Sequence, residues 1–175
     1  VMTWTGTNVN LNLKVNLSFG DDLVSFDDVS IGEDTSLKLS LGENNVICGG
    51  LSQFGALVSY TGAAGGDTLD FSDSQIGETL NVKLGPGTNS VTLASVASNM
   101  DVGQSIIIKG GPQDDTVTFS DANGPAFPGF GAGEGVKLIL ATGVNSVTMT
   151  GFTQLADLSI TTGALDDTIS LDGGE

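Results

Sequence analysis

The sequence lacks histidine and arginine entirely, and it contains only five lysines beside 21 acidic residues. The formal net charge of −16 leaves no basic stripe for phosphate groups, so nucleic acid is not an expected partner. Without histidine or arginine the chain has neither the commonest general base nor the usual cationic stabiliser of developing negative charge, which argues against most enzymes. No apolar run reaches the length of a membrane-spanning helix, so no insertion into a membrane is expected.

The chain has one cysteine, Cys48, and 6% aromatic residues, whereas glycine accounts for 26 of the 175 residues. A lone cysteine cannot form an internal disulfide and says little about the redox compartment. Abundant glycine with few aromatic residues is typical of a β protein with many turns. Helical periodicity is weak, and a short helical turn is expected only between residues 96 and 104.

One short phrase recurs seven times: an Asp or Asn anchor, then alternating polar and apolar residues, as in Asp115-Thr116-Val117-Thr118-Phe119. Alternation with a period of two predicts a strand with one buried face. The spacing of 22 to 30 residues between anchors predicts a stack of similar units. In this alignment Ile47 faces the core and Cys48 points outward. The anchors are Asp22, Asn45, Asp67, Asn89, Asp115, Asn145 and Asp167.

A second alternating segment precedes the anchor in most units, as in residues 80–84, and turn residues such as Gly85-Pro86-Gly87 follow it. The sequence therefore predicts an all-β fold, a parallel β-solenoid of about seven rungs of about 22 residues, in which each rung is one turn of the coil. Residues 1–175 form a single domain. Residues 1–10 are expected to form an N-terminal cap or exchange segment, and residues 121–133 a lateral loop insertion.

The anchors alternate chemically along the chain, from Asp to Asn and back to Asp. In a solenoid this position stacks on itself about every 4.8 Å, and seven adjacent carboxylates would repel each other. Interleaved Asn side chains remove this repulsion and can bridge neighbouring carboxylates. The sequence therefore predicts a structural Asp/Asn ladder that fixes the register of the rungs.

The phrases Gly66-Asp67-Thr68-Leu69-Asp70-Phe71 and 114–119 resemble the G-x-D-T-V-T-L repeats of large secreted bacterial surface proteins of the planctomycete and cyanobacterial type. This resemblance covers the chain from about Leu11 to Leu171. It implies a parallel β-helix at the cell exterior, and the acidic composition rich in Ser, Thr, Gly and Asn is consistent with an extracellular location.

The segments 65–69 and 110–117 also resemble, more distantly, the calcium-binding nonapeptide repeats of RTX-like proteins. Those repeats return every nine residues, whereas the phrase here returns about every 22. Clustered carboxylates in turns can still bind a hard cation, so the cofactor is either none or Ca²⁺. The candidate calcium ligands are Asp21, Asp22, Asp114, Asp115, Asp166 and Asp167.

The five lysines all lie in the segment before an anchor and are expected on one face of the rod. They either keep the sheet soluble or meet an acidic face of a neighbouring rod. Exposed aromatic side chains on residues 1–10 and 121–133 are further candidates for contact with another molecule. The candidates for self-association are Trp4, Phe127, Phe130, Lys14, Lys38, Lys83, Lys109 and Lys137.

These features favour an extracellular structural protein that forms a surface filament or layer by head-to-tail stacking of strands, because open solenoid ends act as templates for further strands. The expected partner is the protein itself, with cell-surface polysaccharide as a second. The alternatives are a calcium-dependent adhesin module and a carbohydrate-active β-helix enzyme. An ice-binding face is disfavoured because charged and apolar residues interrupt the Thr rows.

Overall fold

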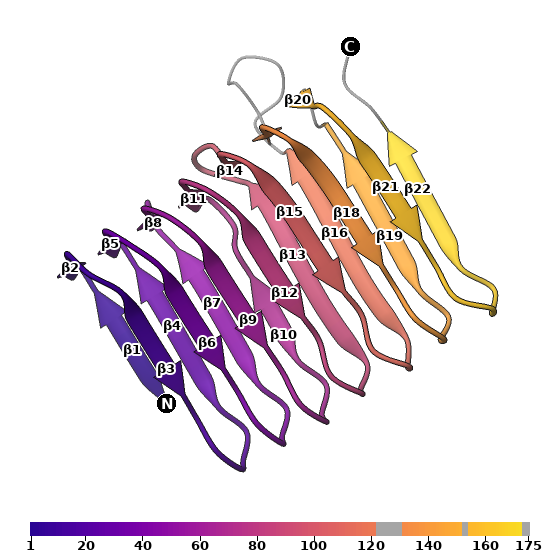
Figure 1. Cartoon of the computed structure of the whole chain (residues 1–175), viewed down its shortest axis with the longest axis horizontal. Coiled ribbons are helices and arrows are strands. Elements are labelled where there is room, and N and C mark those ends of the chain that lie inside the picture. Colours follow the sequence, from indigo (N-terminus) through magenta and orange to yellow (C-terminus); the bar gives the residue numbers. More distant parts are fainter. Residues whose placement is uncertain (122–130, 152–153, 173–175) are drawn as a thin grey trace.

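The computed structural model describes residues 1–121, 131–151 and 154–172. Their chain coils in one direction through three parallel sheets, and each full turn contributes one strand to each sheet (Figure 1). There are about seven turns with a spacing of about 22 residues, as the sequence predicts. No described helix is long and apolar enough to cross a membrane.

Sheet A has eight strands and holds the anchor phrases, each of which begins at or just before its strand. All neighbouring strands in it run parallel. Its strands in order are β1 (Met2–Thr5), β4 (Leu23–Asp27), β7 (Asn45–Gly49), β10 (Thr68–Asp70), β13 (Asn89–Ser95), β16 (Asp115–Asp121), β19 (Ser146–Thr150) and β22 (Thr168–Asp172).

Sheet C has seven strands and corresponds to the segments that precede the anchors. Its strands also alternate between buried and exposed residues, so one face packs on the core and the other faces solvent. Its strands in order are β3 (Leu13–Asn16), β6 (Thr35–Lys38), β9 (Val58–Thr61), β12 (Leu80–Lys83), β15 (Ser105–Lys109), β18 (Gly135–Ile139) and β21 (Leu158–Thr161).

Sheet B closes one side of the coil with seven strands of two residues each. Such short strands cannot show a convincing alternation in the sequence, so the pattern predicted the strands of sheets A and C but did not place these. Its strands are β2 (Asn8–Val9), β5 (Ser30–Ile31), β8 (Gln53–Phe54), β11 (Gln75–Ile76), β14 (Asp101–Val102), β17 (Gly131–Ala132) and β20 (Gln154–Leu155).

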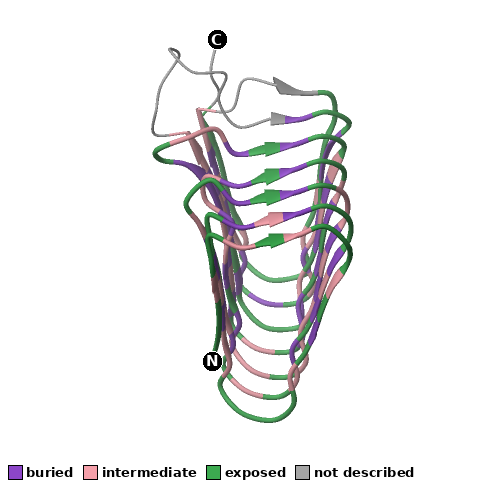
Figure 2. Ribbon diagram, turned by 90° about the vertical axis from the view of Figure 1, so that its left-hand side faces the viewer, coloured by how far each residue is buried: buried purple, intermediate pink, exposed green. Residues whose placement is uncertain are grey.

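The core is a narrow column of aliphatic and aromatic side chains enclosed by the three sheets. Figure 2 shows buried positions, in purple, recurring from rung to rung along the ribbon. Within sheet A two columns point inward, and identical positions stack from rung to rung. Trp4 stacks on Phe26 with 5.1 Å between ring centroids, and Phe54 from sheet B meets Phe26 edge-on at 5.7 Å. Burial of these columns in every rung supplies the main stabilising term.

The register corrects the alignment of the third rung. Val46, not Ile47, pairs with Val24 and faces the core, while Ile47 is 38% exposed. Cys48 pairs with Phe26 and is buried, so the prediction of an outward Cys48 is wrong. The chain offers two consecutive Asn residues here, and choosing the second as anchor shifts every side chain to the opposite face.

The helical turn expected between residues 96 and 104 is also wrong. The Asp73 carboxylate on the preceding rung accepts hydrogen bonds from the backbone N–H groups of Val96 and Ser98, at 2.7 and 2.9 Å. These bonds hold the segment in a bend between β13 and β14. Residues 122–130, with Phe127 and Phe130, lie outside the described residues.

Candidate functional site

The Asp/Asn ladder lies at the bend between sheets C and A, where each rung turns back toward the core. Register and hydrogen bonds place Asn44, rather than Asn45, between Asp22 and Asp67. Asn45 stands one position further on, at the start of β7. The observed ladder is Asp22, Asn44, Asp67, Asn89, Asp115, Asn145 and Asp167.

Each Asn side chain in the ladder forms hydrogen bonds through both its amide nitrogen and its amide oxygen. Asn89 Nδ2 donates to Asp115 Oδ1 on the following rung at 2.8 Å and to the carbonyl oxygens of Gly85 and Gly87 in its own turn at 3.1 and 2.7 Å. Asn89 Oδ1 accepts the backbone N–H of Asp67 on the preceding rung at 2.9 Å. Asn44 and Asn145 repeat the pattern. The Asn side chains therefore tie three successive rungs together.

The ladder Asp side chains are less well satisfied. Asp67 and Asp115 are buried, and in both the Oδ2 atom has no hydrogen-bond partner among the described residues. Burial raises the pKa of the Asp67 and Asp115 carboxyl groups, against the opposing effect of the Asn donors. At the exposed end of the ladder, the backbone N–H of Asn145 lowers the pKa of Asp167.

Tyr60 lies beside the Asp67 carboxylate on the inner side of the bend. Burial first, and then the charge of Asp67, raise the pKa of the Tyr60 hydroxyl. A Cβ on Gly62 would overlap Asp67 Oδ2 and come within 3.1 Å of the Tyr60 hydroxyl oxygen. Neither Asp67 Oδ2 nor the hydroxyl has a hydrogen bond of acceptable geometry, so proximity here does not amount to a bond.

The six candidate calcium ligands do not come together. Asp21 and Asp114 accept backbone N–H groups of Glu43 and Val144 on the following rungs, at 2.9 and 2.7 Å. The Asp22 and Asp115 positions are four rungs apart on sheet A, about 19 Å at the usual strand spacing. Within the described ranges no three carboxylate, His or Cys side chains are grouped to hold a metal ion. Asp166 and Asp167 lie at the last bend, and calcium binding stays a prediction.

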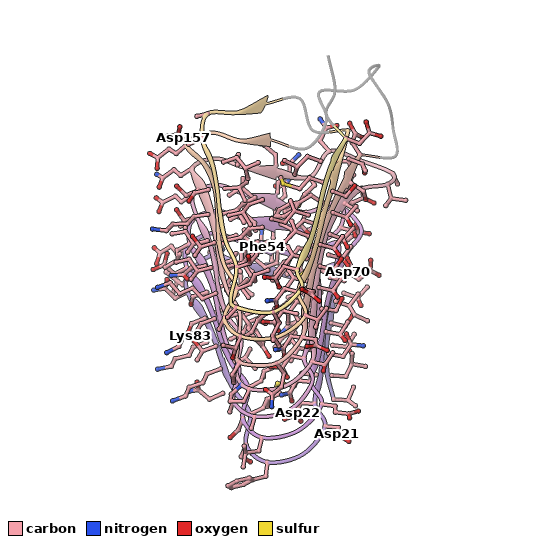
Figure 3. The ribbon with its side chains drawn as sticks, turned by 90° about the vertical axis from the view of Figure 1, so that its right-hand side faces the viewer. Asp21, Asp22, Phe54, Asp70, Lys83 and Asp157 are labelled. Atoms are coloured by element: carbon pink, nitrogen blue, oxygen red, sulfur yellow. The ribbon has the colours of Figure 1, made fainter. Side chains whose placement is uncertain are left out.

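All five lysines project from the outer face of sheet C and are exposed, as expected from their positions before the anchors. Figure 3 shows Lys83 pointing away from this sheet, with Asp157 near the bend toward sheet B on the same side. The lysine Nζ atoms make no ion pair with the described part of the chain. The outer faces of the described sheet C strands contain no Asp or Glu.

Shallow grooves lie on the outer surface of the described rungs. One of about 510 Å³ runs over sheet C beside Lys14 and Lys38, and one of about 390 Å³ runs over sheet B beside Gln53, Gln75 and Asp101. The first is lined by no carboxylate and the second by a single one. A third groove, of about 210 Å³, lies at the bend between sheets B and C and is lined by Glu134 and Asp157 beside Lys137. Hydrolysis of a glycosidic bond uses a pair of carboxyl groups, and this groove, unlike the first two, has such a pair.

The outer face of sheet A carries an unexpectedly regular set of hydroxyl groups. The pairing brings Ser90, Thr116, Ser146 and Thr168 into one column and Thr92, Thr118, Thr148 and Ser170 into the next. None of these eight hydroxyls hydrogen-bonds to the described part of the chain. The interruptions lie on the earlier rungs, where Ile47 and Asp70 stand in the second column. In the sequence these rows were weighed over the whole chain, where the interruptions are confirmed, and the uninterrupted rungs were not separated from the earlier ones.

The end rungs expose side chains that other rungs bury. Ile169 and Leu171 of β22 are 46% and 51% exposed, whereas their partners Val147 and Met149 on β19 are fully buried. At the other end Met2 is 40% exposed and Trp4 is half-buried against Phe26. Residues 2–9 form β1 and β2 of the first rung. Both ends of the described solenoid therefore present apolar cross-sections with unpaired strand edges.

Comparison with known proteins identifies no relative: no family model, curated protein or solved structure matches this chain. The fold is a parallel β-solenoid, and its function is inferred from the surfaces described above.

Proposed function

We propose that this protein is an extracellular structural subunit that builds a surface filament or layer by head-to-tail stacking of its solenoid. One observation carries the proposal: the end rungs expose Ile169 and Leu171 at one end and Met2 at the other, at positions that are fully buried inside the stack. Covering apolar side chains of this kind contributes about 25 cal/mol per Å².

The exposed strand edges at the two ends of the solenoid have the geometry to pair with each other. β1 and β22 are the outermost strands of sheet A, and every internal pair in that sheet is parallel. A β22-to-β1 contact between two copies continues this sheet in the same direction. Sheets B and C each have one strand fewer than sheet A, so the contact is made mainly through sheet A. The contact is heterologous and does not close on itself, which generates a fibre.

Sedimentation of variants at the end face tests the proposal. Leu171→Asp places a carboxylate in the stacking contact, and we expect at least about a tenfold loss of material sedimented as polymer. The matched control is Leu51→Asp, because Leu51 is 62% exposed on a side bend of the rod. Equal sedimentation of both variants and the unmodified chain would exclude stacking through this end.

A second candidate function rests on the hydroxyl face of sheet A. We propose that the eight hydroxyls on β13, β16, β19 and β22 order water as an ice-binding face, because they form a neutral lattice with spacings of about 4.8 by 6.7 Å. Thr118→Lys at its centre is expected to abolish inhibition of ice recrystallisation, whereas Ser59→Lys on sheet C is expected to leave it unchanged. Absence of inhibition by the unmodified chain removes this candidate.

A further inference from the structure

The lysine face is the outer surface of sheet C carrying Lys14, Lys38, Lys83, Lys109 and Lys137, and these lysines make no ion pair with the described residues. Lys137 alone lines a groove together with carboxylates, those of Glu134 and Asp157. The lysine face is the cationic surface of a chain whose net charge is −16. Three of its lysines stand on alternate rungs: Lys38 on β6, Lys83 on β12 and Lys137 on β18. Alternate rungs are separated by about 9.6 Å.

A glutamate column lies at the bend between sheets B and C, and it is formed by Glu33, Glu78 and Glu134. The backbone N–H of Glu134 donates to the Gln104 carbonyl oxygen at 2.8 Å, and that of Gln104 donates to Glu78, so these positions stack directly. Glu33, Glu78 and Glu134 precede β6, β12 and β18, the same three rungs that carry the lysines. Their side chains are exposed.

We propose that the lysine face binds the glutamate column of a second copy of this chain, so that parallel rods associate side by side. When two parallel rods are aligned along their axes without an offset, Lys38, Lys83 and Lys137 of one rod lie at the same heights as the three glutamates of the other rod. The charges are complementary, and both sets repeat every two rungs. Lys38 and Lys83 share one column of sheet C, whereas Lys137 lies two residues earlier on its strand, closer to the glutamate column. Because one surface binds a different surface, each paired rod keeps one surface of each kind free for a further rod, and repetition of the contact builds a lateral array.

This inference rests on the proposed function. Exposed ion pairs are individually weak, so lateral binding requires the many repeats of the contact that a stacked rod provides. The net negative charge of each copy opposes association at long range. At physiological ionic strength, however, screening limits that repulsion to about 8 Å. Contacts between facing lysines and glutamates act within this distance. In about 1 M salt the screening length falls to about 3 Å, and the rods are expected to separate.

Charge reversal tests the pairing. One variant carries Lys38→Glu, Lys83→Glu and Lys137→Glu, and the other carries Glu33→Lys, Glu78→Lys and Glu134→Lys. Electron microscopy of each variant alone is expected to show single rods, with bundled material reduced at least about tenfold. Mixing separately formed rods of the two variants restores bundling. A control with Lys14→Glu changes a lysine on another rung, opposite Ser36, and is expected to bundle as the unmodified chain does.

Carbodiimide cross-linking gives a readout that does not depend on rods, because this reagent joins an ammonium and a carboxylate that are in contact. In a concentrated mixture of ¹⁵N-labelled and unlabelled chains, we expect intermolecular links between the lysine face and the glutamate column. Such links without rods would refute stacking but support the lateral contact. Rods without such links, or bundling that survives both charge reversals, would overturn the lateral contact. Lysine-dependent binding of alginate without links between copies would also overturn it and assign this face to acidic polysaccharide.

Discussion

At the residue scale, the ladder Asn side chains connect rungs that are otherwise held by backbone pairing and core packing. Asn89 donates to Asp115 Oδ1 and to two turn carbonyls, and it accepts the backbone N–H of Asp67. Removing its side chain leaves a buried carboxylate without its donor and a buried N–H without its acceptor. Each loss costs free energy because neither group can be rehydrated without opening the bend.

We therefore expect Asn89→Ala to reduce the free energy of unfolding by about 3 kcal/mol. Urea denaturation followed by circular dichroism measures the change. Ser90→Ala is the control, because Ser90 is the outward neighbour and its hydroxyl makes no hydrogen bond with the described residues. A loss below about 0.5 kcal/mol for Asn89→Ala, within the range of ordinary surface substitutions, would show that the ladder does not hold the rungs together.

The buried ladder carboxylates predict a dependence of stability on pH. Burial raises the pKa of Asp67 and Asp115 in the folded protein, so the folded state binds protons more readily than the unfolded state. Stability consequently rises as the pH falls through these raised values, and the gain is complete below the unfolded pKa of about 3.9. The lowered pKa of Asp167 acts in the opposite direction.

We expect the melting temperature to increase as the pH is lowered from 7 toward the unfolded pKa of about 3.9, and calorimetry across this interval measures it. Asp115→Asn removes one of the two raised groups, so its increase should be smaller than that of the unmodified chain. Relief of repulsion among the other carboxylates changes little between the two proteins. An identical increase in both would contradict a contribution from Asp115.

At the scale of the element, the bends between sheets C and A depend on glycine where neighbouring rungs approach closely. Gly87 has a φ of 145°, and a Cβ there would overlap the Gly65 carbonyl oxygen on the preceding rung. Gly49 has no atom within 4 Å of the position of a Cβ. The two positions therefore separate the effect of crowding and backbone strain from the general effect of removing a glycine.

We expect Gly87→Ala to destabilise the protein by about 2 kcal/mol. Gly49→Ala should leave stability unchanged or raise it slightly, because alanine restricts the unfolded chain. Both are measured by urea denaturation. Equal effects of the two substitutions would mean that the bend relaxes enough to accept a side chain at Gly87.

The elements also show how far the sequence determines the fold. Alternation and the recurring anchor predicted the strands of sheets A and C and the number of rungs, because each strand must bury one face against the same core. The strands of sheet B were not predicted because a strand of two residues is too short to show an alternating pattern. The third rung was misaligned because either Asn44 or Asn45 can serve as the anchor residue. Choosing Asn45 placed Ile47 in the core and Cys48 on the outer face, the reverse of what the structure shows. Keeping the 22-residue spacing from Asp22 selects Asn44.

The ladder itself was predictable from the alternation of Asp and Asn, since stacked carboxylates repel. Its hydrogen-bond directions were not, because they depend on which turn carbonyls face the amide. The bend at residues 96–98 was missed for a similar reason: the carboxylate that holds it, Asp73, comes from another rung. Contacts between positions one rung apart are set by the register, and a register error of one residue removes them.

At the scale of the whole molecule, the central claim is that the solenoid stacks end to end. Its end faces are apolar, whereas charged residues lie mainly on the bends and on sheet C. Growth along the axis and association between axes therefore depend on different forces. The first is expected to persist in high salt, where apolar contacts are not screened, and the second is expected to fail.

The most direct measurement is negative-stain electron microscopy of the purified chain in calcium and in chelator, with rod length recorded in each. We expect rods of uniform width, much longer than the roughly 34 Å of seven rungs, in both conditions. Rods only in calcium would place cation binding at the centre of assembly. Discrete particles of single-chain length in both conditions would contradict end-to-end stacking.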